Sequence, residues 1–433
     1  MGLDPPTLMS LSSLLHGLAS KNEPRLVLSL RPQDPIPDWI THLMVLDRSC
    51  EVAQMGPKSN VLNALRQHIA FSNQAEIGRT LTSTGIIEPE NTAAETATRG
   101  DDIPTAEKGA EAKGEAIIEM RGVRVAYGDK AVLGNWKETV DGNLKDGLYW
   151  TVRRGQRWGI LGPNGSGKTT LLSLICSDHP QTYSQDIKLF GRHRLPEKGR
   201  PGISIFDIQS KIGHSSPEIH QHIPRHLTLR QVLENAWSET FLSPAKLNEK
   251  DHAVVDVCLN KFAPQLRPGY SKLKMRAKSG HDPRGRVTNW ASEVLFRELP
   301  FSAQRVALFL RAIIKKPDLV ILDEAFSGMD EKVRDKCMLF LAHGQTKHFL
   351  VDRKTGKRVV EYSRAWMEGN VIVSGLEPRQ ALLCISHVRE EIPGCVREWI
   401  CLPEANTGRP ARFGKLDGPL DGDASRWNEI WGL

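Results

Sequence analysis

The most constraining feature of this chain is a glycine-rich run that lies between an apolar segment and a helix-like one. The run 162–170 contains the pattern G-x-x-x-x-G-K-[ST] at 162–169. The preceding Trp158–Leu161 predicts a short buried strand, and the following Leu171–Ile175 predicts a helix. In that setting, glycines let backbone N–H groups surround a phosphate, and the helix N-terminus adds positive partial charge. The run therefore predicts a phosphate-binding loop rather than an incidental turn.

The side chains of this loop suit a magnesium–nucleotide complex. Lys168 is long enough to reach β- and γ-phosphates, and the Thr169 hydroxyl is a ligand that Mg²⁺ accepts. We predict that the nucleotide is bound by Gly162, Pro163, Asn164, Gly165, Ser166, Gly167, Lys168, Thr169 and Thr170.

A second motif is an apolar run that ends in two carboxylates. Leu319–Leu322 predicts a strand, and Asp323 and Glu324 follow it directly. Asp323 is expected to hold Mg²⁺, and Glu324 to orient or deprotonate an attacking water. A solvated acidic turn is the alternative, but the phosphate loop earlier in the chain favours the functional interpretation.

Two further side chains are candidates for nucleotide contact. His387 follows the apolar run Ala381–Ile385, where an imidazole can contact the γ-phosphate or the attacking water. Tyr127 lies in a strand-like run before the loop and can stack on adenine. An ordinary strand aromatic is the alternative for Tyr127.

Composition divides the chain into three blocks. Residues 1–71 contain apolar periodic runs, and residues 72–115 are rich in Ala, Thr, Glu and Gly. The second block has too few large apolar groups to form a core, so we expect a disordered linker. From 116 to 433, strands and helices alternate, which predicts an α/β fold with a parallel sheet.

Bulk properties exclude some classes of protein. No apolar run approaches the roughly 20 residues that cross a bilayer. The net charge of +7 does not argue for nucleic-acid binding, and the basic stretch 267–286 has too few aromatics for a stacking platform. Scattered cysteines favour a reducing compartment, so we expect a cytoplasmic location, with a mitochondrial one as the alternative.

Taken together, these motifs resemble the ATP-binding cassette (ABC) ATPases. Residues 162–169 resemble the Walker A motif, 319–324 the Walker B motif and 327–330 the D-loop. His387 matches the switch histidine and Tyr127 the A-loop aromatic. The resemblance covers 116–403 and implies a P-loop NTPase cassette with a helical subdomain that binds and hydrolyses ATP with Mg²⁺. It implies catalytic roles for Lys168, Glu324 and His387, and metal ligation by Thr169 and Asp323.

Two motifs depart from the family pattern. The signature corresponds to Leu299–Ala303, where Pro300 has neither a hydroxyl nor an N–H group and Ser302 is the candidate substitute. The Q-loop region, 211–218, lacks its glutamine, and Glu218 is the nearest polar candidate. The sequences of 211–220 and 386–393 resemble those of the soluble tandem-cassette ATPases, the group of the bacterial molybdate-transport accessory ATPase and its fungal relatives.

The first block resembles the C-terminal part of an upstream cassette, without Walker motifs or signature. Aligning Ile36-Pro37 with Ile392-Pro393 places 38–46 against 394–402. The block also contains a second D-loop-like stretch at 2–7, a predicted helix at 8–18 and a predicted strand at 25–30. An unrelated α/β appendage is the alternative.

The resemblance also implies a partner. In ABC dimers each ATP lies between the Walker A motif of one cassette and the signature of another. The expected partner is therefore a second cassette, either another copy of this chain or a missing upstream half. We expect slow ATP hydrolysis; the alternatives are a non-catalytic nucleotide-binding regulator and an ATPase subunit that energises a transporter on another chain.

Overall fold

The computed structural model describes residues 4–21, 25–30, 36–46, 51–72, 114–128, 130–267, 269, 289–351, 358–420 and 423–432. They divide into two compact units. Unit 1 comprises 1–4, 99–348 and 361–433, and unit 2 comprises 5–98 and 349–360. The expected linker lies outside the described residues from 73 to 113, as does most of the basic stretch 267–286.

Unit 1 is built around a six-stranded sheet in the order β11-β12-β15-β9-β16-β17. The first five strands run parallel and β17 is antiparallel to β16. β9, β12 and β15 are buried along their whole length, which explains why they read as continuous apolar runs. The strands are β9 (Arg157–Leu161), β11 (Ile212–Ser215), β12 (Leu319–Asp323), β15 (Ala381–Ile385), β16 (Glu398–Cys401) and β17 (Arg412–Lys415).

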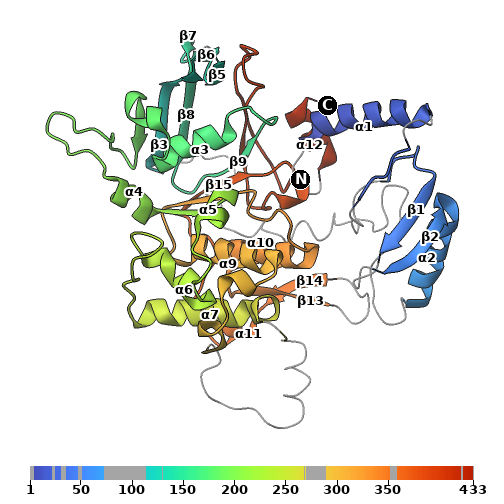
Figure 1. Cartoon of the computed structure of the whole chain (residues 1–433). Coiled ribbons are helices and arrows are strands. Elements are labelled where there is room, and N and C mark those ends of the chain that lie inside the picture. Colours follow the sequence, from blue (N-terminus) through green and yellow to red (C-terminus); the bar gives the residue numbers. More distant parts are fainter. Residues whose placement is uncertain are drawn as a thin grey trace. The chain divides into compact units, whose positions relative to one another are not determined.

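An antiparallel sheet, β10-β3-β8, and α3 pack in one core with part of the main sheet. The same part of unit 1 contains two hairpins, β4–β5 and β6–β7 (Figure 1). These elements are β3 (Ala116–Val123), β4 (Val125–Tyr127), β5 (Lys130–Leu133), β6 (Lys137–Val140), β7 (Asn143–Asp146), β8 (Leu148–Arg153), α3 (Lys168–Cys176), η2 (Pro180–Ser184) and β10 (Ile187–Leu189).

A second core joins the main sheet to a predominantly helical region, which corresponds to the helical subdomain that the resemblance implies. α6, α7 and α9 form its centre (Figure 1), and α9 packs against β11 and β12. The helices of this region and of the rest of unit 1 are α4 (Ile205–Lys211), α5 (Pro217–His222), α6 (Leu229–Glu234), η3 (Asn235–Trp237), α7 (Glu249–Leu266), η4 (Asn289–Ser292), η5 (Phe296–Glu298), α9 (Phe301–Ile314), α10 (Glu331–His343), α11 (Arg364–Met367), η6 (Arg389–Glu391) and α12 (Ala424–Trp431).

Unit 2 contains α1 (Pro5–Ser20), the antiparallel pair β1 (His42–Leu46) and β2 (Val52–Pro57), and α2 (Lys58–Ser72). α1 confirms the predicted helix. The predicted strand at 25–30 is wrong: this segment has no regular secondary structure, and Val27 is 98% exposed. An apolar run becomes a strand only where a neighbouring strand completes its hydrogen bonds, and the described part of the chain provides none there. The strands β13 (Lys347–Val351) and β14 (Arg358–Tyr362) pair with each other after the D-loop.

One half-buried histidine in the main sheet makes the stability of unit 1 depend on pH. His214 lies on β11, where burial lowers its pKa from 6.5 to about 4. Between pH 6.5 and about 4, the imidazole is therefore protonated in the unfolded chain but not in the folded one. Stability that is present above pH 6.5 is lost as the pH falls through this window. The loss amounts to about 3 kcal/mol at most.

We therefore expect His214→Leu to flatten the decline in the free energy of unfolding between pH 6.5 and 4, as measured by urea titration at each pH. The matched control is His226→Leu, because His226 is exposed. Parallel pH profiles for the wild type and His214→Leu would contradict this assignment.

Candidate active site

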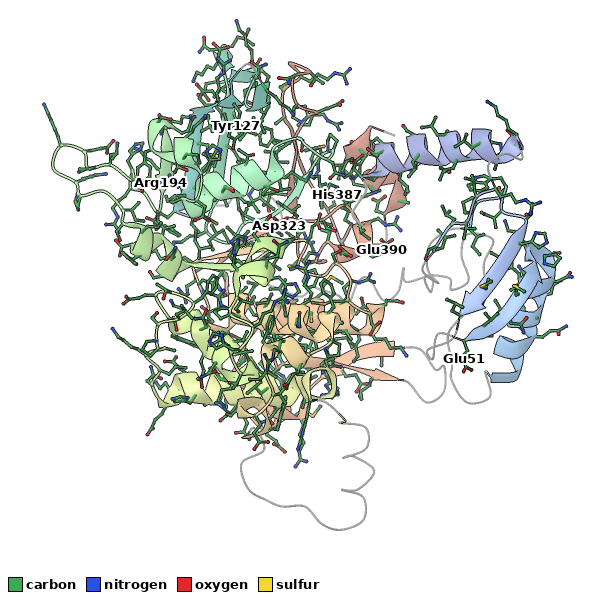
Figure 2. The ribbon with its side chains drawn as sticks, viewed as in Figure 1. Glu51, Tyr127, Arg194, Asp323, His387 and Glu390 are labelled. Atoms are coloured by element: carbon green, nitrogen blue, oxygen red, sulfur yellow. The ribbon has the colours of Figure 1, made fainter. Side chains whose placement is uncertain are left out.

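Three adjacent strands bring the predicted catalytic side chains together. β15 pairs with β12 on one side and with β9 on the other, all parallel. The glycine-rich loop follows β9, Asp323 ends β12 and His387 comes two residues after β15. The carboxyl ends of parallel strands meet at one edge of the sheet, and Figure 2 shows Asp323 and His387 in that region.

The glycine-rich loop has the backbone that a phosphate cradle needs. Gly162 has a φ of 140°, and a Cβ there would lie 2.6 Å from the carbonyl oxygen of Leu402. Gly167 caps the N-terminus of α3 with a φ of 91°. The Ser166 hydroxyl is buried and has no hydrogen-bond partner within the described residues. A buried donor without a partner, beside free helix N–H groups, fits a bound phosphate oxygen.

Lys168 is held at this loop by its own backbone. Its Nζ donates hydrogen bonds to the carbonyl oxygens of Gly162, at 2.8 Å, and Pro163, at 2.9 Å. Burial lowers the pKa of Lys168 to about 8, and the attraction of Asp323, Asp4 and Glu324 opposes that shift. The ammonium group is therefore buried beside carboxylates, and a bound phosphate would further offset the cost of its burial.

Asp323 is 6% exposed, and its environment suits a cation. Burial raises its pKa to about 7, and repulsion from Glu218 and Glu324 adds to this, while Lys168 and Arg305 act in the opposite direction. A bound divalent cation would remove the penalty on the charged carboxylate. The donor set fits Mg²⁺, because the Asp323 carboxylate and the exposed Thr169 hydroxyl are both oxygen ligands.

Glu324 and His387 face each other beside Asp323. Glu324 has a φ of 46°, a left-handed conformation that costs a non-glycine residue about 1–2 kcal/mol and is typical of functional sites. Its backbone N–H donates to the carbonyl oxygen of Ile385 at 3.0 Å. The Glu324 Oε1 lies 3.8 Å from the His387 Nε2. Burial, together with the charge of Lys168, lowers the pKa of His387 to about 4, so this imidazole is neutral at pH 7.

Tyr127 lies apart from this group (Figure 2). The residue is 52% exposed, its hydroxyl is 2.6 Å from the His179 Nε2, and the two rings meet edge to face. Because the Tyr127 ring is exposed and contacts the histidine by its edge, one ring face is open to a nucleobase. Adenine stacking by Tyr127 stays a prediction.

Sequence reasoning missed two contacts of the site. The Asp4 carboxylate accepts a hydrogen bond of 2.9 Å from the backbone N–H of Asn164 in the phosphate loop. The ring of Trp431, on the last helix, lies 6.2 Å from that of His387. Asp4 belongs to the predicted D-loop-like stretch, which was the available signal; no pattern around Trp431 pointed to the histidine.

Comparison with known proteins gives one matching family model and several relatives. Residues 146–327 match the family model described as ABC transporter. An uncharacterized ABC transporter ATP-binding protein of Schizosaccharomyces pombe is 33% identical, over 91% of this chain and 61% of its own length. The ABC transporter ATP-binding protein ModF of Escherichia coli is 29% identical, over 91% of this chain and 62% of its own length. A second uncharacterized ABC transporter ATP-binding protein, from Saccharomyces cerevisiae, is 30% identical over 79% of this chain and 58% of its own length.

The chain thus spans about three fifths of the length of these curated relatives. None of the described helices is both long and apolar enough to cross a membrane. The loop after β9, the acidic end of β12 and the family match coincide in one region of the sequence, so residues 146–327 form an ATP-binding domain of the ABC transporter type.

Proposed function

We propose that this chain binds Mg-ATP and hydrolyses it slowly to ADP and phosphate. The observation that carries the proposal is the convergence of Lys168, Asp323, Glu324 and His387 at the ends of three adjacent strands. Lys168 and the loop N–H groups stabilise the transferring charge, and Thr169 and Asp323 hold Mg²⁺. Glu324 is the general base for the attacking water, and the neutral His387 contacts the γ-phosphate.

Slow turnover is proposed from the start of α9, which carries the altered signature. Pro300 is the N-cap of α9 and contributes no N–H group. Phe301 packs on the D-loop, residues 327–330. A Cβ added to Gly328 would lie 2.7 Å from the Phe301 ring. A signature must present donors to the γ-phosphate of a partner cassette, and here an apolar ring and a proline stand at its start.

We propose a second cassette as the partner, with residues 1–71 corresponding to the C-terminal part of such a cassette. The order strand, antiparallel strand, helix of β1, β2 and α2 repeats that of β16, β17 and α12. The alignment of Ile36 with Ile392 sets β1, His42–Leu46, against residues 398–402, which contain β16. Residues 5–72 also expose many large apolar side chains, as a piece of a larger core would: Leu8, Met9, Leu11, Leu14, Leu18, Val27, Leu30, Met44, Leu46, Val52 and Met55.

The concentration dependence of steady-state ATP hydrolysis tests the proposal. If two chains combine to form each site, the rate rises faster than linearly with protein concentration, because the fraction of dimer rises too. ATP binding is measured on the same samples. A rate strictly proportional to concentration, at a brisk turnover number, would contradict both the slow chemistry and the need for a partner.

The altered signature favours a second candidate function, a nucleotide-binding module in which ATP drives association without turnover. In that case ATP binds and the chain associates, but no phosphate is released above the level of the Glu324→Gln variant. The two candidates share the binding site and differ only in this readout.

A further inference from the structure

A cavity of about 180 Å³ in unit 1 is lined by residues of η2, β10 and the loop 193–197. Among the described residues, neither the phosphate loop nor the signature region 299–303 lines it, and Asp323, Glu324 and His387 do not either. The volume lies below the range of about 300–1,000 Å³ that is usual for sites of drug-sized ligands, so this cavity suits a smaller molecule.

The cavity lies at the opposite end of α3 from the phosphate loop. Arg194, which lines the cavity, donates from its Nε to the Ser177 hydroxyl at 2.8 Å and from its Nη2 to two backbone carbonyls in the last turn of α3. α3 begins at the phosphate loop and has nine residues, so its two ends are about 13 Å apart. Figure 2 likewise shows Arg194 apart from Asp323 and His387. The cavity is therefore separate from the nucleotide site.

Arg194 has one nitrogen left for a ligand. Its Nε and Nη2 bond to the end of α3, whereas its Nη1 has no hydrogen-bond partner within the described residues. Burial lowers the pKa of Arg194 to about 10, and Tyr183 acts in the opposite direction, so the guanidinium is charged at pH 7. Because the helix end already fixes this side chain, it can pair with a carboxylate at little further cost in conformational entropy.

Thr182 adds a hydroxyl group that the fold does not use. The residue is 1% exposed, and its Oγ1 is buried without a hydrogen-bond partner in the part of the chain that the structure describes. Burial of a polar group without a partner costs free energy, and a ligand oxygen in the cavity would recover it. Since Thr182 is one of the lining residues, its hydroxyl is available to an occupant as a donor or an acceptor.

The negative charge of the cavity belongs to Glu197. Its Oε1 lies 3.3 Å from the Nε2 of His193, and the Oδ1 of Asp186 lies 3.7 Å from the same nitrogen. The backbones of Glu197 and Arg200 exchange two hydrogen bonds of 3.0 Å, which hold the loop that carries this carboxylate. The cavity thus has an acidic group on a fixed loop in addition to the fixed guanidinium.

These charges restrict the kind of ligand. One guanidinium and one carboxylate line the cavity, so an inorganic anion or a metal cation would leave one of them unpaired. Within the described residues there is also no group of three or more His, Cys, Asp or Glu side chains that could hold a metal ion. A molecule that carries both charges satisfies both side chains. Leu195 and Pro196 add an apolar wall beside them.

We propose that this cavity binds a small α-amino acid as its zwitterion. The carboxylate pairs with Arg194 and accepts a hydrogen bond from Thr182, and the ammonium group pairs with Glu197. The side chain of the ligand lies against Leu195 and Pro196. This binding does not depend on ATP binding or hydrolysis.

Saturation-transfer NMR on the full chain tests the proposal with five probes. L-Alanine, L-serine and L-valine carry both charges, whereas propionate carries only the carboxylate and ethylamine only the ammonium group. At pH 7 at least one of the amino acids binds about tenfold more tightly than either half-ligand, because each half leaves one charged side chain unpaired. The tightest of the three identifies the side chain that the apolar wall accepts.

Thr182→Val is the most informative variant, because it removes the hydroxyl and keeps the shape of the side chain. No hydrogen bond of the fold is lost with it, so the melting temperature stays the same or rises, whereas the affinity for the tightest amino acid falls by about tenfold. Glu197→Gln weakens the amino acid by a similar factor and leaves the affinity for propionate unchanged. The exposed Glu404→Gln is the matched control and changes neither affinity.

Two further variants complete the test. Arg194→Gln abolishes binding; Thr182→Val and Glu197→Gln keep the test valid where this change loosens the end of α3. Lys168→Met, in the phosphate loop, leaves amino-acid binding unchanged. The proposal is overturned if the half-ligands bind as tightly as the amino acids, if Thr182→Val and Glu197→Gln keep the wild-type affinity, or if Lys168→Met removes the binding. Dissociation constants weaker than about 10 mM for all three amino acids would also overturn it.

Discussion

Glu324→Gln is expected to reduce ATP hydrolysis by about 100-fold or more while ATP is still bound. The amide has the shape of the carboxylate but accepts no proton from the attacking water. Burial and the charge of Lys168 hold the pKa of the neighbouring His387 at about 4, so this imidazole is a weak base at pH 7. Phosphate release measured at saturating ATP, beside ATP binding, checks the prediction.

Glu404→Gln is the matched control, because Glu404 is an exposed glutamate of unit 1. It should leave both rate and affinity unchanged. The Glu324 variant is also expected to fold, because the amide preserves the side-chain volume and the residue keeps its backbone hydrogen bond to Ile385. A variant that hydrolyses ATP at the wild-type rate would remove Glu324 from the mechanism.

The strands that hold the site could be predicted because each is an apolar run next to a recognisable motif. β9, β12 and β15 are buried throughout, so they read as unbroken apolar runs. Each is followed by polar residues of defined chemistry. Knowing that all three are parallel was enough to expect Lys168, Asp323, Glu324 and His387 at one edge.

The contacts that join distant parts of the chain could not be predicted in this way. Asp4 and Asn164 lie far apart in sequence, and their hydrogen bond depends on how the chain start docks on the phosphate loop. Trp431 packs beside His387 because α12 packs against the core. No pattern of apolar residues in the sequence indicates that contact.

The same limit explains the error in the first block. Residues 25–30 have the apolar content of a strand, but secondary structure of this kind is decided by a partner, not by the segment.

Lys168→Met is expected to weaken ATP binding by about 100-fold, which corresponds to about 3 kcal/mol for charge-assisted bonds to phosphate. Methionine keeps the apolar stem but removes the ammonium group that Gly162 and Pro163 hold at the loop. The loss of the cation also acts indirectly. Lys168 opposes the upward shift of the Asp323 pKa, so without it this carboxylate holds its proton more strongly and offers less to Mg²⁺.

Lys198→Met provides the control, since Lys198 is an exposed lysine of unit 1. Binding is measured with a fluorescent ATP analogue in the presence and absence of Mg²⁺. In the wild type, Mg²⁺ strengthens binding; in Lys168→Met both the affinity and this Mg²⁺ dependence fall, because the two charges act on one site. If Lys168→Met bound as tightly as Lys198→Met, the phosphates would have to lie elsewhere, and the glycine-rich loop would lose its role while the fold remained unchanged.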